Sequence, residues 1–294
     1  MRFLIASDFH LNERKRLEDF EKNLREIENI SHRINPEPAV YIIVGDVFDK
    51  RHPTPLELKI FADHLSRVKC NEIQLIIGNH DTVGQNLTTL DWCRGINVNK
   101  VKVYKIFGKT IYFAHRTLSE AKLGPKEIHI DGISYKKLNY DVIVTGHIHK
   151  PQIVNKENPL VLVPGSIERV NFGERGEDKY IWLLDVEKGI KLKRYKLNCR
   201  PMYYIEYDLD NKIIKINDKE IEKGSQPDTN GAIIKATFRG KKSLINKLNY
   251  DKLLDKFSKA YSVDFQFEYS DVAKETTEIE TYTISDKGLI IFFW

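Results

Sequence analysis

Short apolar runs that end abruptly in polar residues recur along the first half of the chain. Five of them are rich in Ile, Val, Phe and Tyr, and they read RFLIASDFH, VYIIVGDVFD, IQLIIGNHD, TIYFAH and VIVTGHIH. Runs of this length and composition predict short, buried β-strands. Because the sites of α/β proteins lie beyond the carboxyl ends of their strands, we expect the five polar clusters to converge in space.

Two amphipathic helices are predicted between these strands. From about residue 15 to residue 34, apolar residues recur at steps of three and four, which predicts a helix with one core-facing stripe. The stripe comprises Leu17, Phe20, Leu24, Ile27, Ile30 and Ile34. A second helix is predicted to begin after Thr54, because Thr54 can cap it, Pro55 suits its first turn and Glu57 can complete a capping box.

The last third of the chain predicts a further small α/β unit. Its strands are read in RPMYYIEYDLD, GAIIKATFRG and VDFQFEYSD, and one helix is read in SLINKLNYDKLLDKFSKAY. The packing face expected for this helix is Leu244, Leu248, Phe257 and Tyr261. The terminal LIIFFW is interpreted as a final strand of this unit, with a short partner-binding peptide as the alternative.

Composition restricts the class of protein. With 41% apolar and 30% charged residues, the chain is expected to be globular and not disordered. Its three cysteines are widely spaced without a C-x-x-C pair, which argues against a disulfide framework or a thiolate zinc site and fits a reducing cytosol. We expect neither a signal peptide nor a membrane span, because no apolar run is long enough.

Positive charge is concentrated late in the chain. Residues 191–259 hold 17 Lys and Arg against 9 Asp and Glu, although the net charge of the whole chain is only +5. Such a segment is either a solvated lysine-rich face or a nucleic-acid contact. Arg239, Lys241 and Lys242, which lie near a predicted turn, are the candidate phosphate contacts.

The polar residues at the strand ends are of the kinds that bind divalent metals. The candidate ligands are Asp8, His10, Asp46, Asn79, His115, His147 and His149. The pairs Asp8/His10 and His147/His149 are spaced i and i+2, so in an extended backbone each pair would project from one side. Imidazole, carboxylate and amide groups without thiolates suit Mn²⁺, Fe or Zn²⁺ better than Ca²⁺ or Mg²⁺, and we favour manganese.

The remaining histidines stand in different sequence contexts. His80 stands in GNHD, where the other residues could simply form a turn but a histidine has no such use. For His32, His52, His64 and His129, the helical or polar surroundings favour ordinary surface positions.

The clusters SDFH, GDVFD, GNHD, AH and GHIH together resemble the signature of the calcineurin-like metallophosphoesterases. Within that superfamily, GDVFDKRHPTP, AHRTLSEA, GHIHKPQ and PGSIERVNFGERGEDK resemble the SbcD-type exonuclease subunit, a bacterial relative of the repair nuclease meiotic recombination eleven. The resemblance implies an α/β fold, a two-sheet α/β sandwich with a small C-terminal α/β cap. It assigns residues 1–197 to the nuclease domain, 198–275 to a DNA-binding cap and 276–294 to a C-terminal tail.

The resemblance also implies a dinuclear metal site. By motif, Asp8, His10 and His149 would hold one ion, and Asn79, His115 and His147 the other. Asp46 would bridge the two ions. His80 would then contact the scissile phosphate or protonate the leaving oxygen, and Asp49 would orient His80, although a salt bridge or a turn is the alternative for Asp49.

The function expected from the sequence is a manganese-dependent DNA nuclease, cytoplasmic and nucleoid-associated, that hydrolyses phosphodiester bonds at DNA ends. One alternative is a metallophosphoesterase for a small phosphodiester or phosphomonoester, and another is a non-catalytic scaffold that binds DNA or an ATPase. The family implies a coiled-coil ATPase partner of the SbcC type, and a homodimer is a further expectation. The helices that dock such an ATPase are not evident, because the sequence ends at Trp294 soon after the cap.

Overall fold

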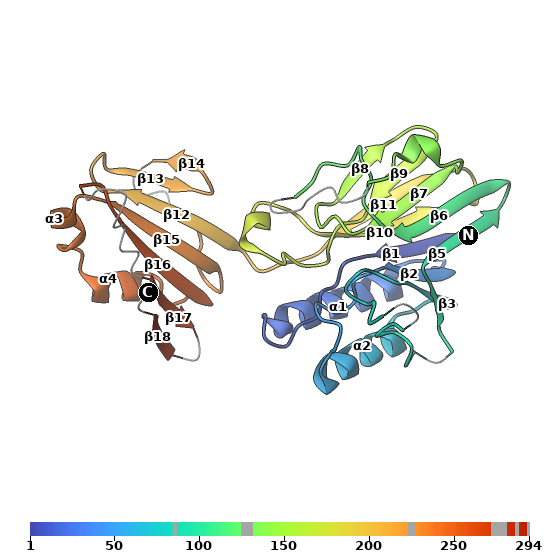
Figure 1. The fold of residues 1–294 in the computed structure, drawn as a ribbon, viewed down its shortest axis with the longest axis horizontal. Helices are drawn as coiled ribbons and strands as arrows, with labels where there is room; N and C mark the ends of the chain where they lie inside the picture. Colours follow the sequence, from blue (N-terminus) through green and yellow to red (C-terminus); the bar gives the residue numbers. More distant parts are fainter. Residues whose placement is uncertain are drawn as a thin grey trace. The chain divides into compact units, whose positions relative to one another are not determined.

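The computed structural model describes residues 1–84, 87–93, 95–124, 132–222, 227–271, 281–285 and 288–292, the last two ranges by their backbone alone. The chain forms two compact units, Met1–Cys199 and Arg200–Trp294, each with its own sheets and core (Figure 1). Among the helices of the described ranges, none combines the length and the apolar character needed to cross a bilayer.

The first unit contains a six-stranded sheet in the order β11-β10-β1-β2-β3-β4. Its strands are β1 (Arg2–Ala6), β2 (Val40–Val44), β3 (Glu72–Ile76), β4 (Asn97–Asn99), β10 (Tyr180–Asp185) and β11 (Lys191–Lys196). β1 to β4 run parallel to one another, whereas β10 is antiparallel to β1. The carboxyl ends of β1, β2 and β3 therefore lie at one edge of the sheet.

A five-stranded sheet in the order β5-β6-β7-β9-β8 packs against the first. Its strands are β5 (Val101–Ile106), β6 (Lys109–His115), β7 (Val142–Gly146), β8 (Gln152–Asn155) and β9 (Leu160–Val163). β6, β7 and β9 are parallel. The five strands predicted from the apolar runs are thus confirmed as β1, β2, β3, β6 and β7, but they are divided between two sheets.

Alternating side chains of the central strands supply two cores. Phe3 and Ile5 of β1 point into the layer between the sheets, while Leu4 and Ala6 pack beneath the helices. Because β1 is buried on both faces, it reads as a continuous apolar run. The fold of this unit is the expected two-sheet α/β sandwich.

The helices α1 (Leu17–Arg33) and α2 (Pro55–Arg67) cover the outer face of the six-stranded sheet (Figure 1). Both were predicted, and the capping box of α2 is confirmed. The Thr54 side chain accepts the Glu57 N–H at 3.3 Å, and the Glu57 carboxylate accepts the Thr54 N–H at 2.9 Å. Short 3₁₀ turns follow at Tyr135–Lys137 and Phe172–Glu174.

The second unit is a seven-stranded sheet with two short helices, in the order β14-β13-β12-β15-β16-β17-β18. Its strands are β12 (Met202–Asp208), β13 (Ile213–Ile216), β14 (Lys219–Ile221), β15 (Ile233–Gly240), β16 (Ser262–Tyr269), β17 (Thr281–Ser285) and β18 (Gly288–Phe292). The predicted strands are β12, β15 and β16. Most of the terminal LIIFFW forms β18, while Phe293 and Trp294 lie outside the described residues.

The single helix predicted over residues 243–261 is wrong. The structure has α3 (Lys242–Ile245) and α4 (Tyr250–Lys256), separated because the Asn249 side chain accepts the Lys252 N–H and starts a new helix there. Ile245 and Phe257 are the buried residues of this segment. Of the two, Phe257 belongs to the predicted packing face and Ile245 does not.

The surface position predicted for His64 is also wrong. His64 of α2 is 1% exposed and lies between two buried partners. Its Nε2 is 3.0 Å from the Tyr41 hydroxyl and its Nδ1 is 3.0 Å from the Glu28 carboxylate. Polar partners on a neighbouring helix and strand thus permit a buried histidine. His32 and His52 are exposed as predicted, and His129 lies outside the described residues.

We predict that protonation of His64 makes the stability of the first unit pH-dependent. Burial lowers the pKa of His64 although Glu28 opposes the shift, so the unfolded chain protonates His64 first as the pH falls below about 6.5. The contribution of neutral His64 to the free energy of unfolding is therefore complete above about pH 6.5. Below that pH it declines by up to about 1.4 kcal/mol per pH unit.

Urea unfolding with chelator at pH 7.5 and 5.5, followed by tryptophan fluorescence, measures this loss. His64→Gln should reduce the difference between the two pH values, whereas His52→Gln at an exposed site should leave it unchanged. Equal losses in all three proteins would contradict the assignment.

Candidate metal centre

The polar clusters that follow the strands of both sheets meet in one place. β1, β2 and β3 of the six-stranded sheet lead into Asp8, Asp46 and Asn79, and β6 and β7 of the five-stranded sheet lead to His115 and His147. The polar side chains therefore meet where the carboxyl ends of strands from two packed sheets lie close together, and not at the strand ends of a single sheet.

The first ligand group contains Asp8, His10 and His149, whose ligand atoms all lie within 4.8 Å of one another. His10 Nε2 and His149 Nε2 are 3.0 Å apart. Asp8 is fully buried, and its carboxylate oxygens accept the main-chain N–H of His147 at 3.1 and 3.2 Å. This contact ties the end of β1 to the end of β7.

The second group contains Asp46, His115 and His147, joined by the amide of Asn79. Asn79 Oδ1 is 3.1 Å from His115 Nε2 and 2.9 Å from His147 Nδ1. Asp46 Oδ2 is also 3.1 Å from His115 Nε2. The carboxylate, the amide oxygen and the two imidazoles thus surround a common point.

Asp46 connects the two groups. Its Oδ2 lies 3.1 Å from His115 Nε2 and 3.8 Å from His10 Nε2, while its Oδ1 accepts the main-chain N–H of His80 at 2.9 Å. One oxygen is therefore held by the protein backbone and the other faces imidazoles of both groups.

The donor and acceptor chemistry of these atoms fits a divalent cation. His115 Nδ1 donates to the Val44 carbonyl at 2.8 Å, and its Nε2 faces two acceptors, Asp46 Oδ2 and Asn79 Oδ1, so that a proton or a metal ion has to lie at Nε2. His149 Nδ1 faces the Glu174 carboxylate at 3.2 Å, which leaves its Nε2 lone pair directed at His10. Facing lone pairs of nitrogen and oxygen require a positive charge between them.

The charges of the site reinforce this preference for cations. Although burial opposes it, the negative charges of Asp46 and Asp8 raise the pKa of His115 to about 10. Burial likewise works against ionisation of Asp46, but the neighbouring His115 and His10 hold the pKa of this carboxyl well below its usual range. The carboxylate therefore stays charged at every pH of interest.

The backbone at the ligands is strained, which corrects the extended conformation that we expected for the i and i+2 pairs. Asp8, His10, Asp46 and His147 have φ values of 51°, 48°, 51° and 92°. Residues other than glycine rarely adopt positive φ, and such strain is commonly found at functional sites. Main-chain hydrogen bonds hold it in place, since the Asp8 and His10 N–H groups donate to the carbonyls of Gly45 and Asp46 at 3.0 Å.

Two glycines allow the ligands to approach so closely. A Cβ atom on Gly146 would lie 2.0 Å from the Val44 carbonyl oxygen and 2.7 Å from His115 Nδ1. A Cβ atom on Gly78 would lie 2.0 Å from Asp46 Oδ1. The glycines that precede His147 and Asn79 are thus required by close packing around the ligands.

Asp81 was not recognised in the sequence, although it stands in the GNHD cluster. It is fully buried and accepts the N–H groups of Val47 at 3.1 Å and Gly78 at 2.9 Å. Burial and the nearby Asp46 carboxylate raise the pKa of Asp81 to about 6. Asp81 therefore joins the loops after β2 and β3 from behind the ligands.

His80 lies beside the first group, but Asp49 contacts it differently from our expectation. The rings of His80 and His10 are 4.9 Å apart in a T-shaped arrangement, and His80 Nδ1 is 2.8 Å from the main-chain carbonyl of Asp49. The Asp49 carboxylate instead binds Asn12 Nδ2 at 2.7 Å and Lys15 Nζ at 2.9 Å. Any orientation of His80 by Asp49 is therefore made through the main chain.

His149 is held by two charged residues that sequence reasoning missed. Glu174 faces its Nδ1, and the fully buried Lys179 donates to its main-chain carbonyl at 2.9 Å. Lys179 Nζ also bonds Glu174 at 2.6 Å and Glu177 at 3.2 Å. Burial opposes the shift, but His149 and Lys179 lower the pKa of Glu174 to about 2. The signal for these residues in the sequence is the charged run GERGEDK, at the end of PGSIERVNFGERGEDK.

The three candidate phosphate contacts belong to the second unit, at the end of β15. Arg239 is bound to the Glu268 carboxylate through Nε at 2.8 Å and Nη2 at 2.7 Å. Lys241 is exposed, and Lys242 is also exposed with its Nζ 5.5 Å from the centroid of the Tyr269 ring. The charge of Arg239 is thus largely neutralised, whereas the two lysines face solvent.

Comparisons with known proteins agree with this arrangement. Residues 1–189 match the family model described as the calcineurin-like phosphoesterase superfamily domain. The chain is 24% identical over 186 residues to the uncharacterized metallophosphoesterase YhaO of Bacillus subtilis (strain 168), covering 50% of this chain and 45% of that protein. The chain thus matches less than half of the length of this curated relative.

Solved structures show similar but distant folds. A novel archaeal phosphodiesterase is 20% identical with a TM-score of 0.43, covering 67% of this chain and all of that one. Vps29 of Chaetomium thermophilum is 14% identical with a TM-score of 0.43, covering 78% of this chain and 98% of that one.

We predict that Glu174 sets the metal affinity of the first ligand group. Glu174→Ala removes the acceptor that fixes the His149 ring, and loss of such a partner typically lowers metal affinity by about 10- to 100-fold. Calorimetric titration of metal-free protein with Mn²⁺ measures this change.

Glu174→Gln, which keeps an acceptor oxygen, should be less severe, and Glu187→Ala at an exposed position should have no effect. Unchanged affinity in a folded Glu174→Ala protein would rule out this role.

Proposed function

This chain belongs to the calcineurin-like phosphoesterase superfamily, and we propose that it is a dinuclear, manganese-dependent phosphodiesterase that acts on DNA. The observation that carries the proposal is the position of Asp46 Oδ2 between His115 Nε2 and His10 Nε2, at 3.1 and 3.8 Å. A carboxylate oxygen shared by two ligand groups is what a bridged pair of ions requires.

The residues would be divided between the ions by group. One ion would be held by Asp8, His10 and His149. The other ion would be held by Asn79, His115 and His147, and Asp46 would bind both ions. Two divalent cations supply a nucleophile at neutral pH and neutralise charge on the phosphoryl oxygens. The family uses divalent metals, and the described His and Asp clusters are suitable for them.

The chain's own residues would position the phosphate and move one proton. His80 Nδ1 donates to the Asp49 carbonyl, so its Nε2 is the atom able to receive or donate a proton. Because the His80 ring lies against the His10 ring, Nε2 is proposed to act on the leaving oxygen of a phosphate bound at the ions. The Asp49 carbonyl would serve as the positioning group.

The charge of the later segment supports DNA as the substrate. Residues 191–259 carry 17 basic against 9 acidic residues, and Lys241 and Lys242 are exposed. Lysine side chains of this kind bind phosphates without reading sequence. A coiled-coil ATPase and a second copy of the chain are proposed as further partners on the basis of the family resemblance.

We predict that His80→Ala lowers kcat for DNA by about 10² to 10⁴-fold, because the proton transfer to the leaving oxygen is lost. The number of bound metal ions should stay the same, because His80 is not a ligand in this scheme. Hydrolysis of linear duplex DNA, single-stranded DNA and a simple bis-ester is measured with Mn²⁺, Mg²⁺ or chelator, and bound metal is measured by elemental analysis. His52→Ala provides the matched exposed histidine and should retain activity.

Three outcomes would contradict this scheme in different ways. Loss of metal in proportion to activity would make His80 a ligand. Faster turnover of nucleotides than of linear DNA would identify a small-molecule phosphoesterase, and no metal-dependent hydrolysis of any substrate would identify a binding scaffold.

A further inference from the structure

A cavity of about 320 Å³ adjoins the second ligand group. Asn79 and His115 form the side that it shares with the candidate metal centre. Its other walls include Thr82, Lys100, Val101 and Arg116. A space of this size next to the ligands can hold a part of the substrate beyond the phosphate that reacts.

The strand topology explains why two cations flank this cavity. β4 ends at Asn99 in the six-stranded sheet and β5 begins at Val101 in the five-stranded sheet, so Lys100 is the crossing point between the sheets. Val101 pairs with Ala114 of β6, and the same antiparallel register continued by one residue sets Lys100 opposite His115. Arg116 directly follows His115.

Neither cation is neutralised by the surrounding protein. In the part of the chain that the structure describes, the side chains of Lys100 and Arg116 make no ion pair or hydrogen bond, and both residues are exposed. Other cations of this unit do have such partners, as Arg2 has in Asp185 at 2.9 Å. Two unpaired cations beside a cavity favour an anionic ligand.

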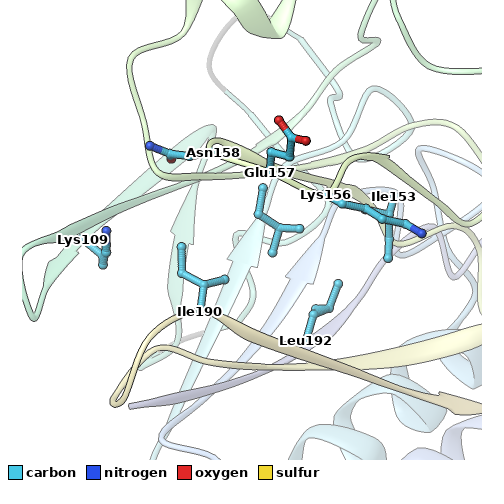
Figure 2. Close-up of a pocket in the computed structure, with 8 residues that line it drawn as sticks. Lys109, Ile153, Lys156, Glu157, Asn158, Ile190 and Leu192 are labelled. Carbon is cyan, nitrogen blue, oxygen red and sulfur yellow. The ribbon is translucent and has the colours of Figure 1, made fainter.

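A second cavity provides a contrast. It measures about 470 Å³ and lies at the opposite end of β6, where Lys109, Ile153, Ile190 and Leu192 are among its lining residues (Figure 2). There Lys109 is 3.3 Å from the Asp141 carboxylate, and no candidate metal ligand lines the cavity. The cavity at Lys100 and Arg116 differs from this one in the described residues, because it combines candidate metal ligands with cations that have no carboxylate partner.

We propose that the Lys100–Arg116 cavity binds a second phosphate of the substrate, next to the phosphate that is hydrolysed. The guanidinium of Arg116 presents paired N–H donors that match phosphate oxygens, and the Lys100 ammonium adds a point charge. This inference rests on the proposed function and specifies its substrate class: a phosphodiester that carries an adjacent phosphate, as in a nucleic-acid strand or a terminally phosphorylated dinucleotide.

A pair of substrates that differ by one phosphate tests the proposal. Thymidine dinucleotide with and without a terminal phosphate, together with a simple bis-ester, is hydrolysed in Mn²⁺ by the wild type, Arg116→Gln and Lys100→Gln. The wild type should show a lower KM for the phosphorylated dinucleotide. Each variant should raise that KM by about 10-fold and leave the KM and kcat for the bis-ester unchanged.

Two controls separate a charge effect from a structural one. Lys105→Gln changes an exposed lysine of β5, the strand that begins directly after Lys100, and should behave as the wild type. Arg116→Lys keeps the charge and should recover part of the preference. Equal KM values for the two dinucleotides in the wild type, or equal losses on all substrates in a variant, would overturn the proposal.

A binding measurement tests the phosphate site even if the proposed catalytic function is wrong. If the protein hydrolyses no substrate, binding of fluorescent forms of both dinucleotides is followed by anisotropy in the presence of Mn²⁺. Tighter binding of the phosphorylated form that Arg116→Gln abolishes would support the cavity and leave the catalytic proposal as the part that failed. Equal binding of both forms would reject the cavity as a phosphate site.

Discussion

Nitrogen and oxygen ligand atoms from two sheets face one another at the candidate metal centre, and the surrounding structure holds them in place. His115 Nε2 is 3.1 Å from both Asp46 Oδ2 and Asn79 Oδ1. Two acceptors opposite an imidazole lone pair repel it unless a proton or a metal ion lies between them. Without a metal ion a proton on His115 meets this requirement, which is why, although burial opposes it, the carboxylates of Asp46 and Asp8 raise the pKa of His115 to about 10.

Several buried contacts supply that restraint. Asp81 fastens the loops after β2 and β3, and Lys179 joins Glu174 to the main chain of His149. Because Lys179 is fully buried, its charge depends on its two carboxylate partners, Glu174 at 2.6 Å and Glu177 at 3.2 Å. The conformation of the loop that carries Glu174 is thus held by the contacts of Glu174 with Lys179 and His149.

Positive and negative charge are separated within the first unit. Carboxylates are gathered at the ligands, where they attract cations, whereas Lys100 and Arg116 stand at the rim of the adjoining cavity. A phosphate substrate needs both features, because its reacting group requires metal ions and its remaining charge requires cationic side chains. In the second unit Arg239 has already been paired with Glu268, which shows that a basic composition alone does not locate a binding site.

The sequence by itself determined five strands of the first unit (β1, β2, β3, β6 and β7), both helices of the sandwich and the kinds of residue at the ends of those strands, because apolar runs, capping and ligand type are local properties. It did not reveal the strained backbone at Asp8 and His147, the buried setting of His64 or the clamp on His149 by Glu174 and Lys179. Each of these depends on partners distant along the chain. The tertiary structure decided them because only packing of two sheets brings those partners within hydrogen-bond distance.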